Sequence, residues 1–75
     1  MVLYVENVKT IKTKNNEKMS FLTLSDEYGS VEGIIFPNDY KKIGELEKNN
    51  SYIFNSRVEV RNNTYQLIIL GINKL

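Results

Sequence analysis

The stretch from Thr13 to Pro37 most constrains how this chain can fold. Residues 18–25 have the two-residue period of a strand, and a second strand follows over residues 30–36. Between them, Asp26-Glu27-Tyr28-Gly29 reads as a tight turn in which glycine can adopt a positive φ. The stretch therefore predicts a β-hairpin that is entered through a polar, lysine-rich loop.

The two faces of the strand over 18–25 differ in an informative way. Leu22 and Leu24 share one face and are the better candidates for the core. Met19, Phe21 and Thr23 share the opposite face. A phenylalanine and a methionine that point away from the core suggest a functional surface.

Further strands are predicted on both sides of this hairpin. Residues 2–13 read as the first strand because they are rich in β-branched side chains and no helix cap precedes them. The apolar residues Val5, Val8 and Ile11 are three apart, so we expect a bulge or bend there. Residues 51–61 and 64–72 read as two more strands around an Asn62-Asn63 turn. The residues expected on their core faces are Tyr52, Phe54, Ser56, Val58, Val60, Leu67 and Ile69.

A short helix is expected over residues 37–47, with Asn38 or Asp39 as its cap and Tyr40, Ile43 and Leu46 on one face. The order strand, strand, strand, helix, strand, strand predicts the all-β class. It is the order of a five-stranded Greek-key OB-fold barrel with one short helix between strands three and four. In that fold the outer face of strands two and three, with the first–second and fourth–fifth loops, binds oligonucleotides or oligosaccharides.

The composition limits the chemistry that is available. The 75 residues make one domain, and they include no cysteine and no histidine. The carboxylates of Asp26, Glu27 and Glu32 lie near one hairpin, yet no histidine, cysteine or phosphate-binding glycine loop joins them. We therefore expect no enzyme activity, metal or cofactor in this chain alone. No apolar run approaches the roughly 18 residues of a membrane span, so a soluble cytoplasmic protein without a membrane partner is expected.

The outward residues suit a single-stranded nucleic acid. Binding such a strand needs aromatic faces that stack on bases and cations that follow phosphates. Candidates for this role are Lys12, Lys14, Lys18, Met19, Phe21, Thr23, Arg57, Arg61 and Tyr65. The net charge of +1 is weak evidence for a polyanionic partner. One stacking ring with a few phosphate contacts predicts weak, salt-sensitive binding.

Structural roles compete with these functional ones. Phe21 can instead pack under a loop, and Met19 is often a filler of gaps. Arg57 and Arg61 can pair with glutamates of neighbouring strands, and Asp26 is expected to fix its own turn through the backbone.

The hairpin and its surroundings resemble a known family. The chain is similar to the OB-fold domain of the bacterial replicative DNA polymerase III alpha subunit, DnaE type. The resemblance lies in Thr13-Lys14, Met19-Ser20-Phe21-Leu22-Thr23-Leu24-Ser25-Asp26, Gly29-Ser30-Val31-Glu32, Phe36-Pro37-Asn38-Asp39-Tyr40, Val58-Glu59-Val60-Arg61 and Gln66-Leu67. Parts of it also occur in anticodon-binding OB domains of class II aminoacyl-tRNA synthetases. Asn15-Asn16 departs from the usual Lys-Gly of the first loop.

The resemblance implies that residues 1–75 are one OB-fold nucleic-acid-binding domain and a fragment of a larger polymerase subunit. Such a module would bind single-stranded DNA weakly and without sequence preference, beside the remainder of the subunit or other replisome proteins. The synthetase relatives imply base stacking at Phe21 and reading of base edges near Glu32. Two alternatives stay open: a tRNA- or RNA-binding OB domain, and a module whose exposed Phe21, Met19 and Ile34 dock another protein.

Overall fold

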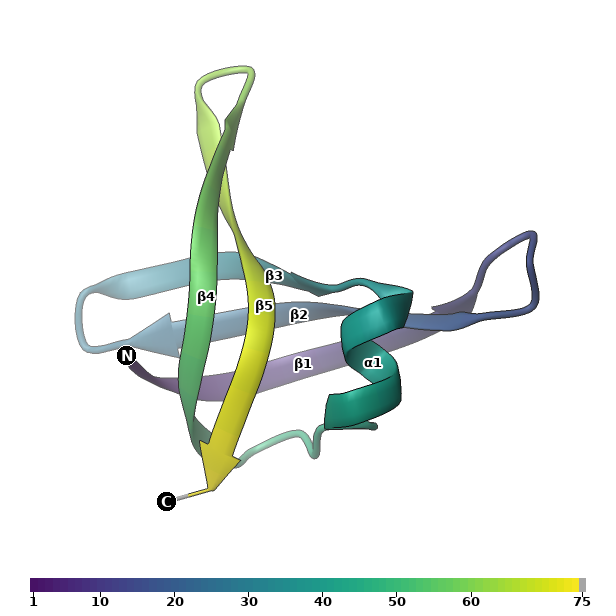
Figure 1. Cartoon of the computed structure of the whole chain (residues 1–75). Helices are drawn as coiled ribbons and strands as arrows, with labels where there is room; N and C mark the ends of the chain where they lie inside the picture. Colours follow the sequence, from purple (N-terminus) through teal and green to yellow (C-terminus); the bar gives the residue numbers. More distant parts are fainter. Residues whose placement is uncertain (75) are drawn as a thin grey trace.

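The computed structural model describes residues 1–74. Five strands and one helix follow each other in the predicted order (Figure 1). Their bounds are β1 Val2–Lys12, β2 Lys18–Asp26, β3 Gly29–Ile35, α1 Pro37–Ile43, β4 Ser51–Arg61 and β5 Thr64–Lys74. The all-β class with a single short helix is confirmed.

The five strands form one sheet that closes on itself in the order β1-β2-β3-β5-β4. β1 pairs antiparallel with β2 along most of its length and with β4 through Val2, Leu3 and Tyr4. β3 pairs antiparallel with β2 and parallel with β5. In Figure 1 the β4–β5 hairpin crosses β1, β2 and β3 steeply, and α1 lies beside the crossing. This is the predicted OB-fold arrangement.

Local irregularities fall where the sequence predicts them. The register of β1 against β2 shifts between Val5 and Asn7, which is the expected bulge. Asn62 and Asn63 have φ angles of 50° and 64°, as a two-residue hairpin turn of the primed type requires. Asn16 has a φ of 62°, so it takes the left-handed conformation that glycine would otherwise supply in the first loop.

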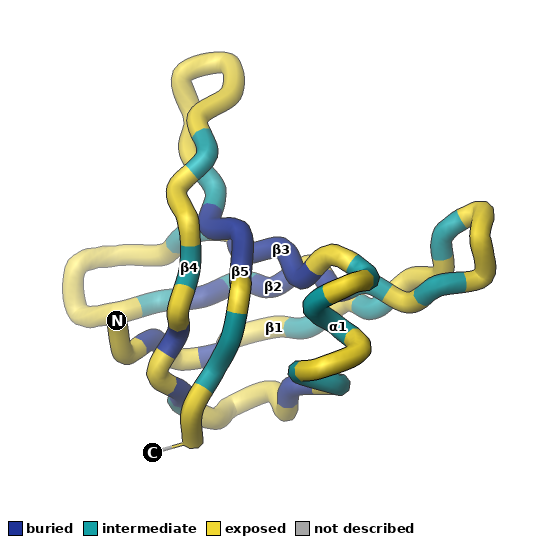
Figure 2. The backbone as a smooth tube through the Cα atoms, in the orientation of Figure 1, coloured by how far each residue is buried: buried dark blue, intermediate teal, exposed yellow. Residues whose placement is uncertain are grey.

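The core lies between the crossing strands, where Figure 2 shows the buried segments. The fully enclosed side chains include Val5, Leu24, Ile35 and Ile69, each with no exposed surface. Gly33 faces this core, and a Cβ atom at this position would lie only 2.8 Å from the Cδ1 atom of Leu24. Glycine is therefore needed here for close packing of the strand against the core.

Two expectations about the helix are wrong. α1 ends at Ile43 rather than at residue 47, because Gly44 leaves the helical conformation with a φ of 78°. Leu46 is still buried, yet from the loop that follows the helix. Phe36 is the N-cap residue and no side chain caps the helix, so neither Asn38 nor Asp39 has that role.

The far half of the β4–β5 hairpin also differs from expectation. Tyr52 and Phe54 are buried as predicted, but Val58 and Val60 are 60% and 69% exposed. Figure 2 shows that the hairpin extends past the other strands and is mostly exposed at its tip. The two valines keep the predicted face, but no core lies beneath them.

Candidate nucleic-acid interface

One row of side chains runs across all five strands on the outer face of the sheet. Phe21 of β2 pairs with Lys9 of β1 on one side and with Ile34 of β3 on the other. Ile34 pairs with Ile68 of β5, and Ile68 pairs with Arg57 of β4. Directly paired residues point to the same face of a sheet, so the row has a cation at each end and an apolar centre. We call it the Phe21 row.

The centre of the Phe21 row is only partly accessible. Phe21 is 38% exposed, whereas Ile34 and Ile68 are 9% and 2% exposed. Neither isoleucine belongs to the core cluster, so they form a second apolar layer on the outer side of the junction between β3 and β5. The expectation that Ile34 is exposed is therefore wrong, because Ile34 lies at this junction between Phe21 and Ile68. The accessible apolar surface at this centre is mainly the face of Phe21.

A polar row lies beside the Phe21 row. Thr23 pairs with Glu32, Glu32 with Gln66, and Gln66 with Glu59. A groove of about 490 Å³ runs along it between β3 and the β4–β5 hairpin, and Tyr65 also lines this groove. Hydroxyl, carboxylate and amide groups offer hydrogen bonds to base edges, whereas the two glutamates repel phosphates. The predicted residues Thr23, Glu32 and Tyr65 are thus brought together in one groove.

The loop between β1 and β2 carries three of the predicted cations. Lys12 and Lys18 are exposed and lie directly opposite each other where the hairpin leaves the sheet, and Lys14 is exposed in the loop. Opposed like charges destabilise a strand pair, and an anion between them relieves the repulsion. By strand alternation Lys12 and Lys18 share the face of Ser20, so they lie on the opposite face from Phe21. Lys18 also lines the groove between this hairpin and α1.

Glu17 is the acidic residue nearest to these lysines in the sequence, and it pairs with the helix instead. The Nζ atom of Lys41 lies 3.3 Å from Oε2 of Glu17. Within residues 1–74, no ion pair involves Lys12, Lys14 or Lys18. Their charges are therefore available to an external anion.

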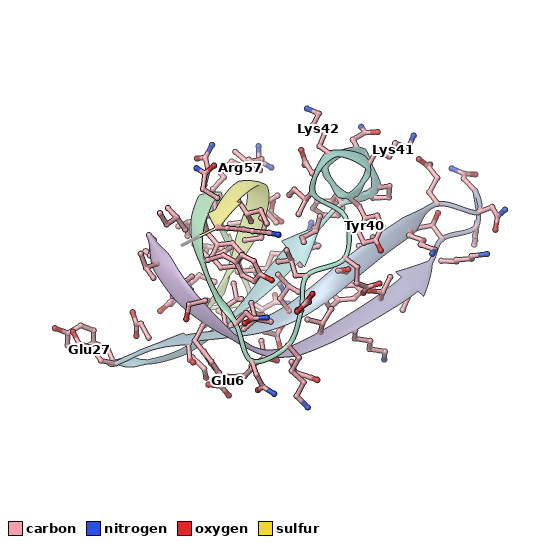
Figure 3. The ribbon with its side chains drawn as sticks, turned by 90° about the horizontal axis from the view of Figure 1, so that it is seen from below. Glu6, Glu27, Tyr40, Lys41, Lys42 and Arg57 are labelled. Carbon is pink, nitrogen blue, oxygen red and sulfur yellow. The ribbon has the colours of Figure 1, made fainter. Side chains whose placement is uncertain are left out.

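The cations of β4 differ from each other. The Nε atom of Arg61 lies 3.0 Å from Oε1 of Glu59, so Arg61 pairs along its own strand. Arg61 is largely exposed, so the contribution of this pair to stability is small and a phosphate can compete for Arg61. Arg57 has no ion pair within residues 1–74. In Figure 3 Arg57 points to the same side as Lys41 and Lys42, away from Glu6 and Glu27.

A hydrogen-bond network supports β1 and β2 from the inner side. The buried Ser20 hydroxyl bonds to Oγ1 of Thr10 at 2.9 Å, and Thr10 donates to the Glu45 carboxylate. The Tyr40 hydroxyl donates to the other oxygen of Glu45 at 3.2 Å. Burial raises the pKa of Tyr40, the Glu45 carboxylate raises it further through its charge and this bond, and Thr10 lowers it. These hydrogen bonds connect the loop after α1 to β1 and to β2, the strand that carries Phe21.

Met19 completes the predicted set. It is half-buried in β2, two residues before Phe21 and on the same face, so it borders the aromatic ring. Lys9, Ile68 and Gln66 also belong to these rows, although the sequence did not predict them as site residues. Strand alternation counted through the bulge of β1 would have placed Lys9 beside Phe21.

Metal ligands and membrane-spanning helices were sought among the described residues as well. Residues 1–74 contain no group of three or more histidine, cysteine, aspartate or glutamate side chains arranged to hold a metal ion. No helix in this part of the chain has the length and apolar character needed to cross a membrane.

Comparison with known proteins identifies relatives of this chain. The chain is 38% identical over 76 residues to DNA polymerase III subunit alpha of Staphylococcus aureus (strain MRSA252), covering 100% of the chain and 7% of that protein. It is 35% identical over 66 residues to DNA polymerase III subunit alpha of Bacillus subtilis (strain 168), covering 87% of the chain and 6% of that protein. The chain thus spans a small part of the relatives it matches.

The search of solved structures gave no match. A family model described as an OB-fold nucleic acid binding domain matches residues 4–75. With that match and the strand order above, the chain belongs to the family of OB-fold nucleic acid binding domains.

Proposed function

We propose that this domain binds single-stranded DNA, weakly and without sequence preference, as an accessory module of a replicative DNA polymerase. The observation that carries the proposal is the Phe21 row, with an accessible aromatic face at its centre and unpaired cations at its ends. Every base has a face that can stack on an aromatic ring, so such a row does not discriminate between sequences.

The dimensions of the row suit more than one nucleotide. Adjacent strands lie about 4.8 Å apart, so the four steps from Lys9 to Arg57 cover roughly 19 Å of curved surface. A base stacked on Phe21 leaves room for phosphates near both ends. Lys18 adds charge beyond the row, in the groove beside α1 and on the opposite face of the sheet from Phe21.

The polymerase setting rests on the relatives. Both are named DNA polymerase III subunit alpha, and the chain matches a short part of each. In this proposal the chain contributes binding, the chemistry belongs to other parts of the polymerase, and the setting is the bacterial cytoplasm. Its protein partners are the remainder of the subunit or neighbouring replisome proteins.

The proposal is tested by an NMR titration of the labelled domain with oligothymidylate at low and high salt. We expect shifts at Lys9, Phe21 and Arg57 that shrink as salt rises. Phe21→Ala should weaken binding about 5- to 150-fold, because stacking on one aromatic ring contributes roughly 1–3 kcal/mol per base. Ile53→Ala is the matched control, since Ile53 is apolar and 37% exposed, close to the 38% of Phe21. Equal effects of both substitutions, or no shifts at all, would contradict the proposal.

The polar row supports a second candidate, a domain that reads RNA. Glu32 and Gln66 are paired neighbours that can bond to base edges, and base-specific reading is typical of single-stranded RNA recognition. A parallel titration with oligouridylate and with mixed-sequence RNA separates the two. Binding of one RNA sequence at least tenfold tighter than oligothymidylate would favour this candidate.

A further inference from the structure

A second groove opens at the end of the barrel away from α1. It has a volume of about 290 Å³ and lies between the β2–β3 turn and the β4–β5 hairpin. Its lining includes two aromatic rings, Tyr28 and Tyr65, and the apolar side chains of Val31, Val58 and Leu67. In Figure 1 the β2–β3 turn projects to the left and the β4–β5 hairpin projects upward.

The aromatic rings of this groove lack cover in the folded domain. Tyr28 is 89% exposed, and Tyr65 and Val58 are 61% and 60% exposed. The turn beneath Tyr28 is nevertheless well defined, because Oδ1 of Asp26 accepts the backbone N–H groups of Tyr28 at 2.8 Å and Gly29 at 3.1 Å. The ring is therefore presented from a fixed backbone, which lowers the entropic cost of binding a ligand.

The chemistry of the lining selects a neutral, flat ligand. No lysine or arginine is among the described residues that line the groove, and its one carboxylate, Asp26, already accepts two backbone amides. The positive group in the lining is the N-terminal ammonium of Met1, which already donates to the backbone carbonyl of Phe54, so the groove offers a phosphate little attraction. A planar ring can instead stack on tyrosine above a floor of Val31 and Leu67.

The groove borders the polar groove beside the Phe21 row. Ser30, Val31 and Tyr65 line both. A nucleic-acid strand that follows the polar groove past these shared residues would reach Tyr28 next. The shared lining favours a nucleobase over a protein side chain as the occupant.

We propose that Tyr28 and Tyr65 form a second stacking site that takes one unpaired nucleobase at the end of the bound strand. This inference rests on the proposed function, since it extends the path of the same single strand. It assigns a binding role to Tyr28, which is not among the candidate residues drawn from the sequence.

The test measures the affinity of two oligothymidylates, of about 4 and 8 nucleotides, for the wild-type domain and for Tyr28→Ala. We expect Tyr28→Ala to lower the affinity for the longer oligonucleotide at least about fivefold. The affinity for the shorter one, which is held at Phe21, should not change. Tyr28→Phe keeps the ring and should bind as the wild type does. Val60→Ala is the control, because Val60 is exposed on the same hairpin and lines neither groove.

The outcomes separate this inference from the proposed function. If Phe21→Ala lowers the affinity for both oligonucleotides and Tyr28→Ala changes neither affinity, the second site is refuted and the proposed function stands. If the wild type binds neither oligonucleotide, both fail. If Tyr28→Ala abolishes self-association of the domain without changing DNA binding, the groove is a protein contact and the inference is overturned.

Discussion

The salt dependence of binding offers a quantitative test of the Phe21 row. Lys9 and Arg57 lie at its two ends, and neither forms an ion pair within residues 1–74. Each phosphate contact to a single strand contributes about 0.7 to the slope of log affinity against log salt, because it releases condensed counterions. The double substitution Lys9→Gln and Arg57→Gln should therefore reduce the magnitude of the slope by about 1.4.

The assay is fluorescence anisotropy of a labelled oligothymidylate between about 50 and 200 mM salt. The matched control is Lys48→Gln with Lys74→Gln, two exposed lysines outside the row. Both double variants change the net charge of +1 by the same two units. The control should keep the wild-type slope. A control that lowers the slope as much as the test variant would show that the overall charge, and not the row, attracts the strand.

Three further predictions concern the scaffold. Gly33→Ala should cost about 1–3 kcal/mol and lower the Tm in thermal unfolding, because its Cβ atom would lie 2.8 Å from Cδ1 of the enclosed Leu24; an unchanged Tm would show that the core can yield. Asp26→Ala should cost about 1 kcal/mol in urea denaturation, since two backbone N–H groups lose their acceptor, while Asp26→Asn should retain most of that stability. Folding raises the pKa of Tyr40 above that of unfolded tyrosine, about 10, so its contribution to stability is present below that pH and is lost as pH rises through the folded pKa. The Tm of Tyr40→Phe should accordingly fall less than that of the wild type between about pH 9 and 11, and parallel curves would contradict the assignment.

Most of the fold follows from local patterns in the sequence. The two-residue period of β2, the Asn62-Asn63 turn and the order of elements were sufficient for the OB-fold. The helix was predicted too long because Leu46 continues the apolar spacing of Tyr40 and Ile43. Leu46 lies in the loop after α1 and its side chain is buried there, so apolar spacing did not require a helical backbone at this residue.

The site was predicted less completely, since its composition depends on pairing between distant strands. Phe21 was found because alternation within a single strand shows which way it points. Lys9 was missed because the bulge between Val5 and Asn7 shifts the faces of β1. Ile68 was missed because its place next to Ile34 depends on the parallel pairing of β3 with β5, which no local pattern reveals.

The exposure of Val58 and Val60 shows another limit of pattern reading. The period of β4 continues unchanged to Arg61 and β5 pairs with it throughout, but β1 pairs with β4 only at Ser51, Tyr52 and Ile53. A sequence pattern shows on which face of the strand a side chain lies, whereas burial also requires another strand or helix that packs against that face. The exposed hairpin that results is what forms the outer wall of both grooves.

The near-neutral charge and the proposed role are compatible if charge is considered locally. Lys9 and Arg57 lie in the Phe21 row, and the carboxylates of Glu32 and Glu59 lie in the neighbouring polar row. A single-stranded nucleic acid can therefore place its phosphates near the cations and its base edges near the carboxylates. Such an arrangement favours one orientation of the nucleic acid on the outer face of the sheet more than it raises the affinity for it. A domain that is covalently joined to a polymerase needs little affinity of its own, because the linkage raises the effective concentration of the strand to roughly millimolar values. Weak binding of the domain is therefore compatible with the role proposed above.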